Sequence, residues 1–376
     1  MAEVKYSHET TPISEMLRND ASSLVAGYFG HEWSVCDWVK LNHKLETQVA
    51  RLTLEDGNGN RKTAILKYID SRFYADPATW KYLPEFFEEK INYRYLNIIR
   101  ERFSRFPEYY AELPGMFLIE DLGPDVFVFN GVDTIITALA ETFVMLHESA
   151  RGTEQLYLQA REMSDAGKDI RKYSAQGCGE VFDQGCKDIT DFFSILNIPK
   201  RERLEYFLQQ ARSLVMTESI FWSFVHDDLA DRRQSVVLEG KVILLDFEHG
   251  KFFHRLIDLS KLLMGKVERD YEKKAMIYHH PHIPTSLGDK YLSIWQQYSP
   301  DAPSRDVWEM HFAAANIFQT MMIIGRMNEF HGTEVLYSLA GNLRMILPRL
   351  AHHLENNKAF GEFGEILITF TDRIMI

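Results

Sequence analysis

Apolar and polar positions alternate in the first third of the chain, and this pattern predicts β-structure there. Apolar residues recur through 49–54, and a second apolar run covers 63–69. Between the two runs, residues 56–60 read DGNGN, a composition that favours tight turns. Two apolar strands joined by a Gly/Asn turn predict a β-hairpin within residues 34–70.

The following segments predict one helix and one more strand. Between residues 85 and 102, apolar side chains recur near helical spacing, which predicts a helix. A short apolar run at 116–119 then predicts a strand. It ends abruptly at residues 120–124, EDLGP, where adjacent glycine and proline predict a stop in regular structure.

After this stop the spacing of apolar residues becomes mostly helical. Ile136, Leu139 and Phe143 lie on one face of a predicted helix that begins near residue 133. A second hairpin, built from residues 236–238 and 242–245, interrupts the helical region. The other predicted helices cover about 200–217, 257–275, 286–298, 305–329 and 333–356.

The boundary between the two kinds of sequence falls near Gly123. Residues 1–123 form the predicted N-terminal lobe, which is β-rich with one main helix and is expected to bind a nucleotide. Residues 124–376 form the predicted C-terminal lobe, which is mostly helical and holds the second hairpin. A chain of 376 residues exceeds what one hydrophobic core usually supports. The sequence therefore predicts an α+β protein with a small antiparallel β lobe and a larger helical lobe.

Composition narrows the range of partners. Asp and Glu total 54 against 42 Lys and Arg, the formal net charge is −12, and no run of basic residues is present. This balance argues against nucleic acid or an anionic membrane as the main partner. The most apolar run, 312–325, is too short for a membrane span and is interrupted by Asn316 and Gln319.

The cysteines and the N-terminal residues indicate the cellular compartment of the protein. Three cysteines without a CxxC pair do not make a disulfide framework, which is typical of a reducing compartment. The first residues show no basic segment followed by an apolar stretch, the pattern of a signal peptide. We therefore expect a cytoplasmic protein.

Two acidic residues stand at the ends of apolar strands beside the second hairpin. Asp228 lies in the segment 224–229, FVHDDL, and Asp246 lies in 244–248, LLDFE. The hairpin between them should bring both carboxylates to one edge of a small sheet. Phosphoryl transfer from ATP needs a base for the proton of the acceptor hydroxyl and an acidic ligand for Mg²⁺. Because Mg²⁺ prefers one or two carboxylates with water and phosphate oxygens, this pair suits the two tasks.

With His226-x-Asp228 and the strand end at 245–248, the chain resembles the aminoglycoside phosphotransferase superfamily, which is protein-kinase-like and includes choline kinases. The resemblance implies ATP and Mg²⁺ as cofactors, with Asp228 as the catalytic base and Asp246 as a metal ligand. It also implies a supporting role for Asp258, which stands in an Asp-Leu pair on the next helix. We expect His226 to bond backbone and shape the catalytic loop.

The resemblance continues upstream of the catalytic loop. Lys67 ends an apolar strand at the place of the family's lysine that holds the α- and β-phosphates. Glu89 stands where a helix glutamate orients that lysine, with Glu88 as the fallback. The segment after residue 116 resembles the hinge, where the carbonyl of Glu120 and the amide of Leu122 would meet adenine.

Two departures from the family pattern affect the metal and the phosphates. The family's Asn after the base binds a second metal ion. Here Gln234 takes that place if one residue is inserted, and Arg233 takes it if none is. Gln offers the same amide oxygen, whereas a cation cannot ligate Mg²⁺. The family's nucleotide loop is often rich in Gly or Ser, whereas residues 41–47, LNHKLET, which stand in its place, contain no glycine, and Lys44 or Thr47 could contribute.

Plainer interpretations of the same residues stay open. Asp228 and Asp246 could solvate a hairpin, Lys67 could be a surface lysine, and Glu89 could face solvent on its helix. The histidines within 278–282 fit a surface loop better than a metal site, because no acidic or thiol ligand completes the set nearby.

Three hypotheses for the function follow. The first is an ATP-dependent kinase that moves the γ-phosphate to a hydroxyl of a small molecule resembling an aminoglycoside, a sugar or an amino alcohol. The second is a nucleotide-binding pseudokinase that acts as a binding or regulatory module, motivated by the missing Asn and the glycine-free loop. The third is a related fold that transfers a nucleotidyl group. The sequence favours the first and leaves the acceptor open.

Overall fold

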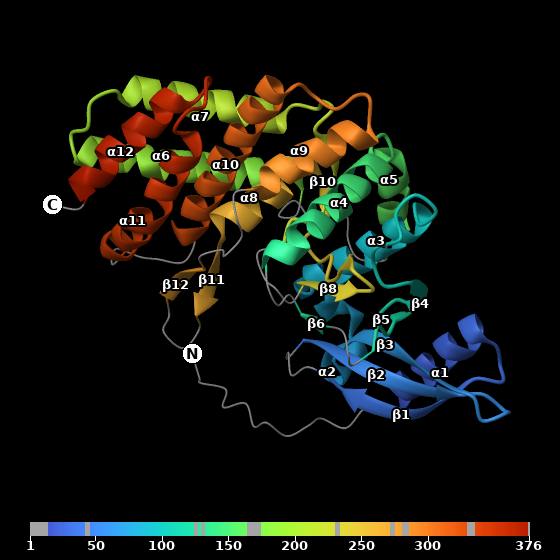
Figure 1. Ribbon diagram of the computed structural model, residues 1–376. Helices are drawn as coiled ribbons and strands as arrows, with labels where there is room; N and C mark the ends of the chain where they lie inside the picture. Colours follow the sequence, from blue (N-terminus) through green and yellow to red (C-terminus); the bar gives the residue numbers. More distant parts are fainter. Residues whose placement is uncertain are drawn as a thin grey trace, which may run out of the picture.

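The computed structural model shows a β-rich region at the N-terminal end of the chain and a larger helical region beyond it (Figure 1). The predicted class, α+β with a small antiparallel β lobe and a larger helical lobe, is confirmed. The structure describes residues 14–41, 46–123, 127–128, 132–163, 174–229, 234–270, 275–279, 286–328 and 335–374.

An antiparallel sheet forms the body of the small lobe, in the order β1-β2-β3-β5-β4. The predicted hairpin is confirmed, because β2 and β3 pair along their whole length. Its turn is held by Asp56, whose side chain accepts hydrogen bonds from the amides of Asn58 and Asn60, both at 2.9 Å. The strands are β1 Ser34–Lys40, β2 Thr47–Glu55, β3 Arg61–Ile69, β4 Tyr109–Leu113 and β5 Met116–Glu120.

Helices cover the small-lobe sheet. α3, Pro84–Ile98, is the predicted main helix, and nearly every side chain from Phe86 to Leu96 is buried. α1, Glu15–Phe29, contacts β4 and was not predicted. Two short elements, α2 (Ser71–Tyr74) and the 3₁₀ helix η1 (Pro77–Tyr82), connect β3 to α3.

The large lobe is built around α10, which contacts α6, α7, α8 and α11. α6 and α10 cross closely at two glycines. A Cβ on Gly185 would lie 1.9 Å from the Met321 carbonyl oxygen, and one on Gly325 would lie 2.2 Å from that of Val181. The helices are α4 Val132–Ala150, α5 Glu154–Glu162, α6 Ala175–Ile195, α7 Arg201–Met216, α8 Leu256–Met264, α9 Ser286–Tyr298, α10 Arg305–Asn328, α11 Val335–Leu354 and α12 Gly361–Ile374.

Three small sheets lie within this helical region. The predicted second hairpin is confirmed as β8 and β9, to which β6 adds one strand. The prediction that Asp228 and Asp246 lie at one edge of the same small sheet is wrong, because β7, before Asp228, pairs with β10, whereas β9, before Asp246, pairs with β8. The bounds are β6 Phe127–Val128, β7 Trp222–Val225, β8 Ser235–Leu238, β9 Lys241–Leu244 and β10 Lys251–His254.

One predicted helix, over 257–275, is wrong in its second half. α8 ends at Met264, and the chain then forms an antiparallel hairpin of β11, Lys266–Asp270, and β12, Ala275–His279. Gly265 has φ 82°, a left-handed conformation that ends the helix and that glycine adopts without steric cost. The predicted helix was too long because the helical pattern of apolar residues in α8 was extended past Gly265.

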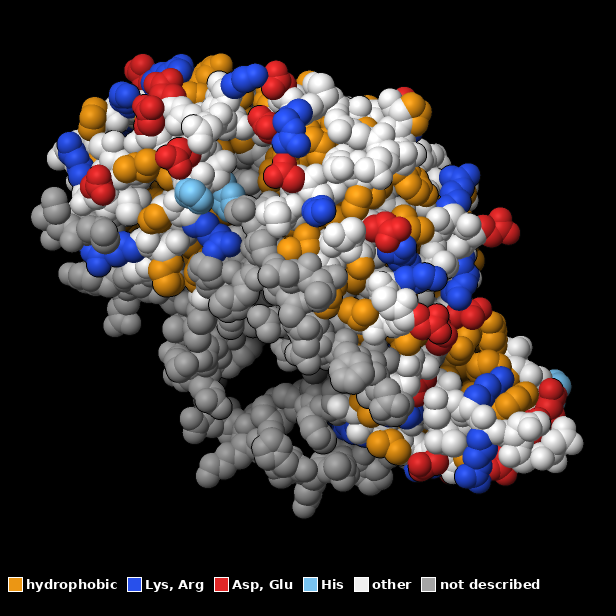
Figure 2. All heavy atoms as spheres, in the orientation of Figure 1, with side chains coloured by type: hydrophobic (Ala, Val, Ile, Leu, Met, Phe, Trp, Pro, Cys, Tyr) orange, Lys and Arg blue, Asp and Glu red, His pale blue; other side chains and the backbone are white. Residues whose placement is uncertain are grey.

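Acidic and basic side chains are interspersed on the face of the molecule that Figure 2 shows. Among the described residues, no helix combines the length and the apolar character that crossing a membrane requires.

Candidate active site

Lys67 connects the two lobes. It lies on β3, between β2 and β5, and its ammonium group donates a hydrogen bond to the Glu89 carboxylate on α3. The same ammonium lies 3.0 Å from Oδ1 of Asp246, which follows β9 in the large lobe. We call Lys67, Glu89 and Asp246 the open cluster, because the Asp246 side chain remains 35% exposed.

The choice between the two helix glutamates is clear in the contacts. Glu89 pairs with Lys67, whereas Glu88 forms a bidentate ion pair with Arg161 of α5, with both N–O distances 2.7 Å. Both glutamates are buried, so neither lies on a solvated helix face. Glu88 thus joins α3 to α5, while Glu89 pairs with Lys67.

The open cluster holds two acids around one cation. Burial disfavours the charge of Lys67, but Asp246 and Glu89 outweigh it and raise the pKa of the ammonium well above its ordinary value. Burial raises the pKa of Glu89 to about 8 against the effect of Lys67, and the carboxylate of Asp246 adds to the rise. The cluster therefore carries more acid than its one ammonium can balance.

Asp258 organises the loop that follows β7. Its carboxylate accepts hydrogen bonds from the backbone amides of His226, at 3.0 Å, and Asp227, at 2.7 Å. Nε2 of the buried His147 lies 3.0 Å from the same carboxylate. Nε2 of His226 lies 2.6 Å from the carbonyl oxygen of Leu245, which ties the loop to the segment that carries Asp246.

A second charged cluster lies beneath this loop. Asp227 has φ 55°, a left-handed conformation, and its carboxylate pairs with Lys251 of β10 and with Lys261 of α8, the latter at 2.7 Å. All three side chains are at most 6% exposed, so we call them the sealed cluster. Burial opposes the charge of Asp227, but the two lysines hold the pKa of its carboxyl far below the usual range.

Asp228, the predicted base, lies among three polar side chains. Nε2 of Gln234 donates a hydrogen bond to Oδ2 of Asp228. Nε2 of His249 lies 3.8 Å from that same oxygen and 3.7 Å from Oε1 of Glu248. The side chains of Asp228, Glu248 and His249 are between 15% and 22% exposed. Burial and the positive charges of Lys261 and Lys251 lower the pKa of His249 well below its ordinary value, so the imidazole is neutral at pH 7.

The remaining predicted residues lie at the edge of the described site. Glu120 ends β5, and its amide donates to the carbonyl of Glu108 at 2.8 Å. Leu122 follows in the short segment that leaves the small lobe. Their contact with adenine stays a prediction. Lys44 and Arg233 lie outside the described residues.

Sequence reasoning missed Lys251, Lys261, Glu248 and His249. The two lysines had no signal in the sequence, because their common partner is 24 and 34 residues away along the chain. Glu248 and His249 could have been predicted from the sequence, since they lie two and three residues after Asp246.

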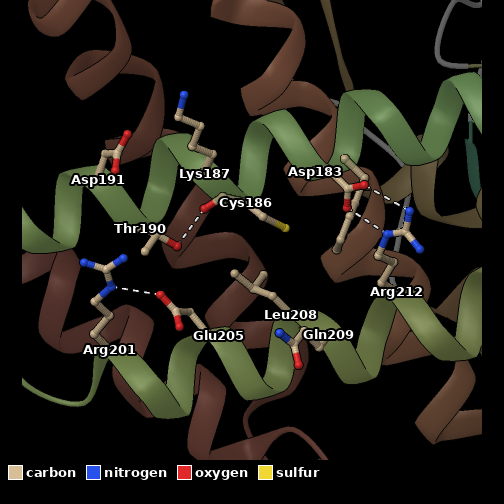
Figure 3. Close-up of a pocket in the computed structure, with 11 residues that line it drawn as sticks. Asp183, Cys186, Lys187, Thr190, Asp191, Arg201, Glu205, Leu208, Gln209 and Arg212 are labelled. Carbon is tan, nitrogen blue, oxygen red and sulfur yellow. Dashed lines mark hydrogen bonds and ion pairs between the residues drawn. The ribbon is translucent and has the colours of Figure 1, made fainter.

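Described residues line two cavities of about 320 Å³ each. Both cavities lie away from this site. One lies between α6 and α7, where Asp183 pairs with Arg212 and Arg201 pairs with Glu205 (Figure 3). The other lies between α10 and α11 and is lined in part by Trp308. Neither includes a predicted site residue.

The chain is similar to solved structures of antibiotic phosphotransferases and of choline and ethanolamine kinases. The macrolide 2′-phosphotransferase MphH from Brachybacterium faecium has 13% identity and a TM-score of 0.48, covering 90% of this chain and 98% of that chain. An ethanolamine kinase from Plasmodium vivax has 11% identity and a TM-score of 0.46, covering 95% and 85%. The choline kinase LicA from Streptococcus pneumoniae has 13% identity and a TM-score of 0.41, covering 87% and 100%.

No protein-family model matches the sequence, and no curated protein matches it.

Proposed function

We propose that this protein is an ATP- and Mg²⁺-dependent phosphotransferase that acts on a hydroxyl group of a small molecule, as a member of the aminoglycoside phosphotransferase superfamily. The observation that carries the proposal is the open cluster. Lys67 from one lobe and Asp246 from the other are in contact, and Glu89 orients the lysine. The segment of Asp246 is tied through Leu245 and His226 to the loop that carries Asp228.

The donor set of the site fits Mg²⁺. Asp246 offers a partly exposed carboxylate in a cluster that has more acid than base. Oε1 of Gln234 is buried and has no hydrogen-bond partner among the described residues, so it is a further available oxygen. Carboxylate and amide oxygens are the hard ligands that Mg²⁺ takes in phosphate sites. We assign the metal to Asp246, with Gln234 as the second ligand.

The lysine and the hinge would hold the nucleotide. ATP, when bound, supplies the phosphoryl group, and Mg²⁺ offsets the charge of its phosphates. Lys67 is protonated and lies between β2 and β5, where it can meet the α- and β-phosphates. The Glu120 carbonyl and the Leu122 amide, after the end of β5, would bind the adenine edge.

Asp228 would accept the proton of the acceptor hydroxyl. Gln234 hydrogen-bonds its Oδ2, and Asp258 fixes the two preceding backbone amides. A carboxylate held on a rigid loop positions the hydroxyl oxygen for in-line attack, and proton acceptance of this kind contributes roughly 10²- to 10⁴-fold to a rate. His226 bonds backbone and therefore has a supporting role, not a catalytic one.

The test is ADP release in the presence of Mg²⁺ and a panel of hydroxylated acceptors that includes aminoglycosides, a macrolide, choline, ethanolamine and sugars. We expect turnover with at least one acceptor and a loss of about 10²- to 10⁴-fold in kcat for Asp228→Asn. Removal of Mg²⁺ by chelation should abolish turnover. Asp301→Asn is the matched control, since Asp301 is an acid whose side chain is 59% exposed and pairs with Arg151.

Two other outcomes would reject the proposal in distinct ways. Binding of Mg·ATP without turnover on any acceptor would favour the pseudokinase. Appearance of AMP on a product would favour nucleotidyl transfer. We favour phosphotransfer, because Lys67, Glu89 and Asp246 are in contact and His226 ties the loop of Asp228 to the segment of Asp246.

A further inference from the structure

Beside the open cluster, three side chains outside the assigned magnesium site have the arrangement of metal ligands. Asp228, Glu248 and His249 each present one ligand atom, and all three atoms lie within 4.8 Å of one another. We propose that these residues form a second, distinct site for a divalent transition metal ion such as Zn²⁺, and that occupation of this site blocks the catalytic base.

The spacing of the ligand atoms supports the site. Zn²⁺ binds carboxylate oxygen and imidazole nitrogen at about 2.1 Å in a tetrahedral arrangement, which places neighbouring ligand atoms about 3.4 Å apart. Nε2 of His249 lies 3.8 Å from Oδ2 of Asp228 and 3.7 Å from Oε1 of Glu248. Closing these two gaps needs side-chain movements of a few tenths of an ångström, and the ligand atoms of Asp228 and Glu248 lie within 4.8 Å of one another. Three protein ligands leave the fourth position to water.

Gln234 provides a second, independent observation. Its side chain is 6% exposed, its Nε2 donates to Asp228, and its Oε1 has no hydrogen-bond partner among the described residues. A buried acceptor without a partner is costly, and a ligand or ion beside it removes that cost. Rotation of the amide by half a turn would present this oxygen to an ion held by Asp228, so Gln234 would ligate either this ion or the Mg²⁺ at Asp246, but not both.

The chemistry of the donors selects the kind of metal. Mg²⁺ prefers oxygen donors, whereas imidazole nitrogen suits Zn²⁺ and other transition metals. A dication between Asp228 and Glu248 would be attracted by both carboxylates, whose ligand atoms lie within 4.8 Å of one another. His249 therefore distinguishes this site from the magnesium site at Asp246.

Occupation has a functional consequence that rests on the proposed function. A carboxylate oxygen of Asp228 that is bound to a metal has lost its basicity, so it can no longer accept the proton of the acceptor hydroxyl. The proposed phosphotransfer would then be inhibited by micromolar Zn²⁺ at saturating Mg²⁺. The metal-binding claim itself does not depend on turnover.

Calorimetric titration of tag-free, full-length protein with Zn²⁺, in the absence of nucleotide, tests the binding. Co²⁺ is added in parallel, because its visible absorption reports nitrogen and oxygen ligands. We expect one equivalent to bind and His249→Gln or Glu248→Gln to lower the affinity by about 10- to 100-fold or more. His352→Gln is the matched control, since His352 is a histidine whose side chain is 75% exposed on α11.

Two results would overturn the site. The first is the absence of a one-to-one Zn²⁺ complex in the wild-type protein. The second is affinity that survives in both His249→Gln and Glu248→Gln, with melting temperatures showing that the variants are folded, or that disappears in His352→Gln. Failure of the phosphotransferase proposal would leave these titrations unchanged, because they contain neither ATP nor acceptor.

Discussion

Two charged clusters flank the loop that carries Asp228, and they are opposites in composition and exposure. The open cluster places one cation, Lys67, between two acids, and its Asp246 side chain is 35% exposed. The sealed cluster places one acid, Asp227, between two buried lysines. The open cluster has more acid than base and is partly exposed to solvent. The sealed cluster has more base than acid and is buried.

The difference in composition and exposure indicates different roles: the open cluster can bind a ligand, and the sealed cluster supports the loop. A buried charge is stable only when an opposite charge and hydrogen bonds compensate it, so the sealed cluster fixes the loop but has no open position for a ligand. The open cluster has an exposed carboxylate that a cation can approach. We infer that the sealed cluster holds Asp228 in place, while the open cluster would bind Mg·ATP.

The largest effect is expected from Asp227→Asn, because the substitution leaves two buried lysines without their counter-charge. We expect a loss of about 3–5 kcal/mol in the free energy of unfolding. Denaturation by urea, followed by circular dichroism, measures it. The double variant Asp227→Asn/Lys261→Met removes one surplus cation and should recover part of the loss. Equal stability of Asp227→Asn and wild type would mean that the sealed cluster does not support the loop.

The next effect is expected from Asp246→Asn and Lys67→Met in the open cluster. We expect kcat/KM to fall by about 10²- to 10³-fold, as when one electrostatic contact to developing charge is removed. The free energy of unfolding of Asp246→Asn should change by only about 1 kcal/mol, because Asp246 is partly exposed. Steady-state kinetics and urea denaturation on the same preparations measure the two quantities. A large stability loss with unchanged kinetics would reverse the roles that we assign to the clusters.

A smaller effect is expected at a buried pair of histidines. Nε2 of His254 lies 3.1 Å from Nδ1 of His311, and the His311 ring stacks on Phe221 with centroids 4.0 Å apart. Burial lowers the pKa of His311 to about 4. Stability from this group is therefore complete above about pH 6.5, the value in the unfolded chain, and is lost as the pH falls towards 4.

This dependence amounts to about 1–2 kcal/mol between pH 7 and pH 5. The melting temperature of His311→Phe should fall less over that range than the melting temperature of the wild type. Phenylalanine keeps the stacking on Phe221 and removes the titrating group. Parallel curves for the two proteins would show that His311 is not neutral in the folded state.

The sequence predicted those parts of the fold that depend on neighbours in the chain. The hairpin of β2 and β3 was found because DGNGN separates two apolar runs, and α9 was found within residues 286–298 because its apolar residues keep helical spacing. The helix over 257–275 was extended too far, since the left-handed Gly265 was not weighted as a stop. α1 was missed altogether.

The residues of the candidate site also divide into those that a local sequence pattern predicted and those that it did not. Asp228 and Asp246 follow apolar strands in a recognisable order, so a local pattern pointed to both. The contact of Lys67 with Asp246 joins residues 179 positions apart, so no local pattern predicts it. Lys251 and Lys261 were missed, because nothing in the residues around them shows that they meet Asp227.

Calorimetric titration with ATP, in the presence and absence of Mg²⁺, tests the central claim most directly. We expect the wild-type protein to bind one ATP with Mg²⁺, to bind it at least about 10-fold more weakly without Mg²⁺, and to lose that difference in Asp246→Asn. ATP binding that is the same with and without Mg²⁺, or no ATP binding by a folded wild-type protein, would contradict the account.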